Sequence, residues 1–139
     1  MSAIGRGFIA GVCLLVGGAL PPAAAEETPS QKEKAAAGIA SQELMAARQA
    51  FWEGRYTESV QKYRSLLEQD PERPSIRGEL GNVLYAQGKR DAAAKDYFQA
   101  AVGHLDRGEY TRANDLYHAL ARLDASRAND LAQRLWHRR

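Results

Sequence analysis

The sequence predicts an all-α fold. From residue 35 to the C-terminus, apolar side chains recur three and four residues apart, which is the spacing of a buried helix face. Clear examples are Val60, Tyr63, Leu66 and Leu67, then Ile76, Leu80, Val83 and Leu84, then Ala113, Leu116, Tyr117 and Leu120. This stretch has only two prolines, Pro71 and Pro74, and no run of alternating Val, Ile and Thr. We therefore expect helices throughout and no sheet.

The N-terminus has the features of a secretory signal peptide. Arg6 precedes an apolar stretch from Phe8 to Leu20, and the small residues Ala23 and Ala25 follow a Pro-Pro pair. We expect cleavage after residue 25 and export to a periplasm. The alternative is a retained N-terminal helix that anchors the protein in the inner membrane. Cys13 lies inside the apolar stretch behind Val12, so it is interpreted as a small hydrophobic residue and not as a lipidation site.

Residues 26–35 are polar and lack periodicity, and they are predicted to form a flexible linker. A helical domain over residues 36–139 follows. Its expected helices span residues 36–53, 57–69, 74–87, 91–106, 111–122 and 126–137.

A sequence pattern recurs after three glycines. From Gly54 and from Gly108, a Tyr, a Thr, a small residue, a second Tyr and a Leu occur at identical offsets, and residues 88–100 fit the same frame. Each glycine can adopt the positive φ that ends a helix. The pattern predicts N-caps at Thr57, Asp91 and Thr111, close helix contacts at Ser59, Ala93 and Ala113, and space-filling rings at Tyr63, Tyr97 and Tyr117.

On these residues the chain resembles the tetratricopeptide repeat family, a helix-turn-helix of 34 residues. Gly54 and Gly88 are 34 residues apart, Leu80-Gly81 matches the family's Leu-Gly pair, and Glu43 stands where the family has Trp. The resemblance implies a short α-solenoid of about two and a half repeats, with units at about 40–73 and 74–107, a partial unit at 108–123 and a cap at 126–137.

The third repeat departs from this period. Gly88 and Gly108 are only 20 residues apart, so the helix at 91–106 must close the second unit and also open the next hairpin. Tyr97 and Ala101 supply the bulky and small pair expected of an opening helix. After Leu123, the capping sequence Asp124-Ala125-Ser126 begins the last helix, which should cover the open end of the stack.

Composition and motifs argue against catalysis and against nucleic-acid binding. The 139 residues include 19 basic and 17 acidic residues, a net charge of +2, and Cys13 is the single cysteine. The closest approach to a helical metal motif is Asp115 with His118, which has no third ligand in the sequence. We expect no enzyme activity, no metal, no cofactor and no small-molecule substrate.

The resemblance implies that the first helix of each repeat lines a concave groove. The positions concerned are Leu44, Arg48, Phe51, Trp52, Gly78, Asn82 and Tyr85. Adjacent Phe51 and Trp52 point about 100° apart, so we expect one to be exposed as a binding anchor, the alternative being that both pack between helices. By the same resemblance Asn82 could hold the backbone of an extended ligand, unless it is an ordinary surface residue.

The C-terminal end, from Arg122 to Arg139, carries a net charge of +3. Basic side chains are favoured near a helix C-terminus, which is one explanation. The other is contact with an acidic partner or anionic lipid through Arg134, Trp136, Arg138 and Arg139.

These inferences predict an exported, non-enzymatic interaction protein. It would be an adaptor, scaffold or assembly factor of an envelope complex that binds a peptide or helix of a protein partner. One alternative is a membrane-anchored structural subunit of a larger envelope complex. A second alternative, a hydrolase or an enzyme-linked regulator, would need a cofactor site that the sequence does not suggest.

Overall fold

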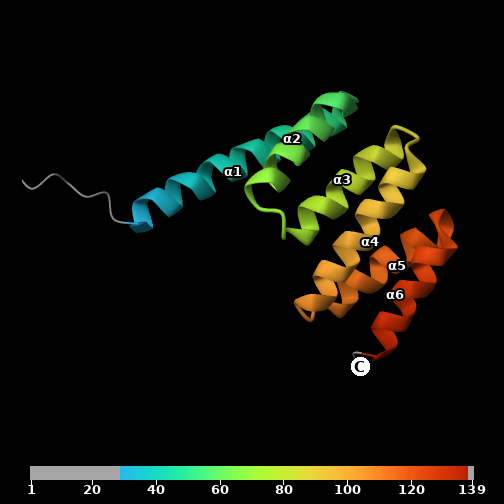
Figure 1. The fold of residues 1–139 in the computed structure, drawn as a ribbon. Helices are drawn as coiled ribbons and strands as arrows, with labels where there is room; N and C mark the ends of the chain where they lie inside the picture. The colour runs from blue at the N-terminus through green and yellow to red at the C-terminus, as the bar shows by residue number, and fades with distance from the viewer. Residues whose placement is uncertain (1–28, 138–139) are drawn as a thin grey trace, which may run out of the picture.

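The structure, a computed structural model, describes residues 29–137, which form six helices and no strand (Figure 1). The helices are α1 (Pro29–Trp52), α2 (Tyr56–Gln69), α3 (Pro74–Ala86), α4 (Arg90–Asp106), α5 (Tyr110–Leu123) and α6 (Ala125–His137). The predicted all-α class is confirmed. The bounds of α2 to α6 agree with the predicted ranges to within one residue at each end. The predicted signal peptide and Cys13 lie outside the described residues.

The first helix is longer than the sequence pattern predicted. It begins at Pro29, so residues 29–35 are helical and their assignment to a flexible linker was wrong. Proline is favoured in the first turn of a helix, where no N–H is needed, and Lys, Glu and Ala that follow are good helix formers. Residues 33–39 are exposed, and this part of α1 projects beyond α2 (Figure 1). Periodicity missed it because it has no buried face.

Glycines close three of the turns as predicted. Gly54, Gly88 and Gly108 have φ values of 73°, 77° and 73°, a region that other residues rarely adopt. The predicted N-caps were wrong, because α2, α4 and α5 begin one residue before Thr57, Asp91 and Thr111. The residues that precede these helices make no side-chain capping bond. The glycine turn itself sets the start of the next helix, so no side-chain cap is required.

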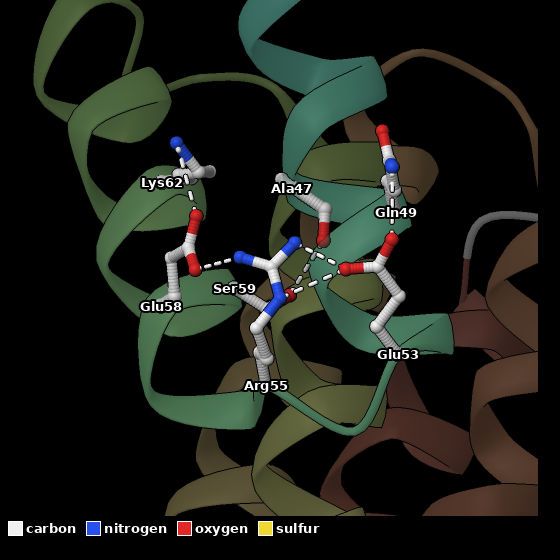
Figure 2. Close-up of polar contacts among 7 residues, drawn as sticks. All are labelled: Ala47, Gln49, Glu53, Arg55, Glu58, Ser59 and Lys62. Carbon is white, nitrogen blue, oxygen red and sulfur yellow. Dashed lines mark hydrogen bonds and ion pairs between the residues drawn. The ribbon is translucent and has the colours of Figure 1, made fainter.

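A polar network fixes the turn between α1 and α2 (Figure 2). The Arg55 guanidinium lies between two carboxylates; its Nε donates to Glu53 at 2.8 Å, and its other side pairs with Glu58. Beneath it, the buried Ser59 hydroxyl donates to the carbonyl oxygen of Ala47 at 2.8 Å. The small side chain of Ser59 therefore allows the close approach of α1 that the pattern predicted.

Helix α4 serves three neighbours. It packs extensively against α3 and α5 and also contacts α6, so the prediction of a helix shared between two hairpins is confirmed. Tyr97 and Ala101 of α4 are both buried in the common core. The approach of α3 is so close that a Cβ added at Gly81 would lie 2.7 Å from the Tyr97 ring. The 20-residue spacing thus produces an overlap of repeats within one continuous core.

The last helix begins at a genuine cap. The Asp124 carboxylate accepts a hydrogen bond from the backbone N–H of Arg127 at 3.0 Å, so the cap is the first residue of the predicted capping sequence 124–126. The apolar side of α6 buries Ala128, Leu131 and Leu135 against the rest of the bundle. Helix α6 therefore closes the core at the C-terminal end.

Candidate functional site

Two adjoining hollows cross the surface at α3. The first has a volume of about 180 Å³ and is lined by Arg48, Phe51, Trp52, Tyr63, Glu79, Asn82 and Val83. The second, of about 150 Å³, is lined by Tyr85, Tyr97, Ala119, Arg122 and Leu123. Asn82 lines the first hollow and Tyr97 the second, and the Tyr97 hydroxyl donates to Asn82 Oδ1 at 2.7 Å, so this hydrogen bond connects the two hollows. We call both hollows together the groove. It contains all five residues predicted to bind a partner: Arg48, Phe51, Trp52, Asn82 and Tyr85.

A carboxylate holds the floor of the first hollow. Glu79 accepts hydrogen bonds from Arg48 Nη2 at 2.6 Å, from Arg48 Nε at 2.8 Å and from the Tyr63 hydroxyl at 2.8 Å. Burial alone would raise the pKa of Glu79, but the hydrogen bonds from Arg48 and Tyr63 outweigh it and lower the pKa. Glu79 is therefore ionised and neutralises Arg48. Sequence analysis missed Glu79, although it lies one turn before Asn82 on the same helix face.

The two adjacent aromatic residues of α1 have different surroundings. Phe51 is half-buried against the core, with its ring centroid 5.7 Å from that of Tyr56. Trp52 stands edge-on to Phe51 and is 83% exposed. The expectation that one of the pair is exposed is confirmed. Because exposed Trp side chains are favoured binding anchors, Trp52 remains the predicted one.

Asn82 and Tyr85 extend the groove along α3. Burial raises the pKa of Tyr97 to about 12, so its hydroxyl stays protonated and donates to the Asn82 oxygen. The amide oxygen is thereby engaged while Asn82 itself is exposed, and contact of its Nδ2 group with a ligand stays a prediction. The Tyr85 ring is 50% exposed and has the Arg90 guanidinium 5.9 Å from its centroid.

Two other positions predicted to face the groove do not line it. Leu44 is half-buried against the core. A Cβ at Gly78 would lie 3.8 Å from Ala100 on α4 and 4.0 Å from Leu116 on α5, so Gly78 faces those helices and its prediction was wrong. The reason is that the shortened third repeat brings Leu116 of α5 to this side of α3.

Residues 44–103, from α1 to α4, match the family profile described as tetratricopeptide repeat (TPR). Residues 44–103 therefore form a TPR-type region. The TPR is in general a non-enzymatic fold for protein–protein interaction, and it is consistent with the groove and with the six-helix array. No curated protein matches the chain. The matched residues include every residue that lines the first hollow, and also Tyr85 of the second. Helices α5 and α6 lie beyond the match.

In the last helix, Arg134 and Trp136, the two described members of the predicted contact set, point to different sides. Arg134 pairs with Asp130 at 3.0 Å, and its guanidinium lies 5.5 Å from the Phe98 ring centroid on α4. Trp136, two residues on, points to the other side of α6 and lines a hollow with Tyr117 of α5. Arg138 and Arg139 lie outside the described residues, so contact with an acidic partner or lipid stays a prediction.

Two histidines have structural partners. His104 is buried in the last turn of α4 with Nδ1 2.6 Å from the Glu109 carboxylate, and this hydrogen bond lowers the pKa of Glu109. His118 contacts Asn114 at 3.3 Å. Among the residues that the structure describes, no three His, Cys, Asp or Glu residues gather where they could hold a metal. Within residues 29–137, no helix combines the length and apolarity needed to cross a bilayer.

Proposed function

We propose that this protein is a non-enzymatic adaptor, scaffold or assembly factor in the periplasm, where it captures a peptide or helix of a protein partner in the groove. One observation carries the proposal: Trp52 and Tyr85 are large aromatic side chains left exposed on either side of the Asn82 amide. Partly exposed aromatic rings beside an oriented amide donor suit recognition of an apolar side chain and a backbone carbonyl.

Charge makes a smaller contribution to the proposed binding. Arg48 is neutralised by Glu79 inside the first hollow. Residues 26–139 carry 18 basic and 17 acidic side chains. We therefore expect aromatic contacts to set the affinity, which should be in the micromolar range, about −8 kcal/mol, because the groove is short.

Site-specific photo-crosslinking tests the groove. A photoreactive residue at position 52 or 85 should cross-link a discrete partner in an envelope fraction, and one at Gln61, exposed on α2, should not. With that partner in hand, Trp52→Ala and Tyr85→Ala should each weaken binding at least about fivefold, roughly 1 kcal/mol. Trp136→Ala, at an equally exposed tryptophan outside the groove, is the matched control. Equal losses in all three variants would contradict the proposal.

Two further measurements test the location and the basic end. A mature N-terminus at Glu26 in an osmotic-shock fraction supports the exported adaptor. An intact N-terminus in the membrane fraction favours the alternative, a membrane-anchored structural subunit. Removal of Arg138 and Arg139 should mainly lower the association rate and its salt dependence. If that deletion abolishes binding while Trp52→Ala and Tyr85→Ala bind normally, the protein works through its basic end and the groove proposal is wrong.

A further inference from the structure

The second hollow of the groove has cations at its edge and, among the described residues that line it, no carboxylate. Its lining consists of Tyr85, Tyr97, Ala119, Arg122 and Leu123. Arg122 is the one charged group among these five residues. Arg90 brings a second guanidinium to the rim, 5.9 Å from the centroid of the Tyr85 ring. This end of the groove is therefore positively charged, whereas Glu79 neutralises Arg48 at the other end.

Neither guanidinium is neutralised within residues 29–137. Arg90 and Arg122 are both exposed, and neither takes part in an ion pair with any residue of this range. Asp124, two residues after Arg122, pairs with Arg127 instead. Asp115 is seven residues before Arg122, which places it two turns away, about 10 Å along α5. The charge at this end of the groove is therefore available to a partner.

Helix stability explains only part of this positive charge. Arg122 is in the last turn of α5, where the helix dipole favours a cation, but this does not require its side chain to line the hollow. Arg90 begins α4 and Lys89 precedes it, and the dipole disfavours positive charge at that end of a helix. Asp91 in the same first turn offsets part of this cost. Charges that the fold itself does not favour, at the edge of a binding hollow, indicate a ligand of opposite charge.

We propose that the second hollow recognises an acidic side chain of the partner, with Arg122 as its main contact and Arg90 beside it. The inference rests on the proposed function, because it assigns a chemistry to one end of the same groove. The planar donors of the Arg122 guanidinium match the two oxygens of a carboxylate. The Tyr85 ring and Leu123 offer apolar contact to the methylene groups of the same Asp or Glu side chain.

A positive end gives the groove a direction. Trp52 in the first hollow suits an apolar side chain, so the partner segment should place its apolar residue there and its acid at Arg122. Charge complementarity of this kind selects partners and speeds association more than it raises affinity. The aromatic contacts therefore still supply most of the affinity, and Arg122 decides which segments bind and in which orientation.

Selection from a random peptide library displayed on phage tests the inference with a defined probe. The full chain should enrich peptides that combine an aromatic or large aliphatic residue with Asp or Glu at a fixed spacing. Arg122→Glu should enrich Lys or Arg at the acidic position instead. Arg64→Glu is the matched control and should enrich the same acidic peptides as the original, because Arg64 is exposed but lines a separate hollow beside α2. Enriched peptides without an acidic position would overturn the inference.

Charge exchange with one enriched peptide tests the contact itself. Arg122→Glu should raise the dissociation constant of the acidic peptide at least about tenfold in titration calorimetry, and Arg90→Glu at least about threefold. Replacement of the peptide's acid by Lys should return the affinity for Arg122→Glu to within about threefold of the original pair. This recovery also shows that the variant is folded. Absence of any recovery would mean that Arg122 does not contact the acid.

The aromatic variants separate this inference from the proposed function. If Trp52→Ala and Tyr85→Ala weaken peptide binding and Arg122→Glu does not, the groove function stands and acidic recognition is wrong. If no peptide is enriched, or neither aromatic variant weakens binding, the proposed function fails and the inference fails with it. Binding to anionic phosphatidylglycerol vesicles that Arg122→Glu abolishes and Arg64→Glu retains, without enrichment of acidic peptides, would assign the arginines to a lipid surface and overturn the inference.

Discussion

Gly81 on α3 has no room for a side chain, because a Cβ there would lie 2.7 Å from the Tyr97 ring on α4. Gly81→Ala should therefore lower the free energy of unfolding by about 1–3 kcal/mol, since the ring or the helix must shift. Urea denaturation followed by circular dichroism measures this change. Gly38→Ala in α1 is the control: nothing lies within 4 Å of its Cβ, and helix propensity should raise stability by about 0.5–1 kcal/mol. A similar loss in both variants would mean that the close contact does not matter.

Glu79 makes the stability depend on pH. Glu79→Gln should cost about 1 kcal/mol at pH 7, because Gln binds Arg48 and the Tyr63 hydroxyl more weakly than a carboxylate does. The folded state holds the pKa of Glu79 below its ordinary 4.5. Its stabilisation is therefore fully present above pH 4.5 and is lost as the pH falls through the folded pKa. Denaturant melts at several pH values should show the variant and the original converging in acid.

Asp96 on α4 should show the opposite trend and serves as the contrast. Burial raises the pKa of Asp96 above its ordinary 3.8, more than Arg77, 3.5 Å away, can lower it. Ionised Asp96 then costs stability, and this cost appears as the pH rises from 3.8 through the raised pKa. Asp96→Asn should therefore gain stability relative to the original over this same pH range. A gain in stability that appears as the pH falls would mean that folding lowers the pKa of Asp96 instead of raising it.

The sequence located the groove residues but not the interactions that hold them. Trp52 and Tyr85 could be placed by their positions in the repeat, which is a local property. Glu79 was missed because its partner Arg48 is 31 residues away and meets it only when α1 and α3 both pack on α2. Gly78 was misplaced because the shortened third repeat puts Leu116 over it. Contacts between repeats depend on how the whole chain folds, and the spacing of residues within one repeat does not predict them.

At the scale of elements, α4 packs against more helices than one helix of a regular repeat array is expected to contact. It contacts α3, α5 and α6, and its Tyr97 ring is buried in the common core against Gly81 of α3. Tyr97→Ala should cost about 3–5 kcal/mol. Tyr63→Ala, on a helix that packs mainly against α1 and α3, should cost less, as denaturant melts of the two variants would reveal. Equal losses, or a larger loss at Tyr63, would mean that sharing α4 adds nothing to the stability.

The N-terminal part of α1 should contribute little to the fold. Residues 33–39 are exposed, and they project past the end of α2 (Figure 1). A chain that begins at residue 40 should therefore keep, to within about 2 °C, the melting temperature of a chain that begins at residue 33, because none of residues 33–39 is buried. Differential scanning calorimetry of the two chains measures it. A fall of more than about 5 °C would show that this segment has a stabilising contact that its exposure does not indicate.

At the scale of the whole molecule, the helices form a linear array in which each helix depends mainly on its neighbours. The α3–α4 pair occupies the middle and has packed helices on both sides, whereas α1 and α6 lie at the two ends. In such an array stability is the sum of local terms and of neighbouring interfaces, so it is lowest at the ends. Sharing α4 couples α5 and α6 to the middle more tightly than a full repeat would.

Native-state hydrogen exchange tests this distribution. Amides of α3 and α4 should exchange most slowly, and those of the first turns of α1 should exchange fastest, because only the middle pair requires global opening. Tyr97→Ala should then accelerate exchange in α5 and α6 more than in α1 and α2, since both C-terminal helices rest on α4. Tyr63→Ala should accelerate exchange more in α1 and α2 than in α5 and α6, because Tyr63 lies on α2, which packs on α1. The same uniform acceleration in both variants would mean that the molecule opens only as a single unit, and that the shared helix does not divide it.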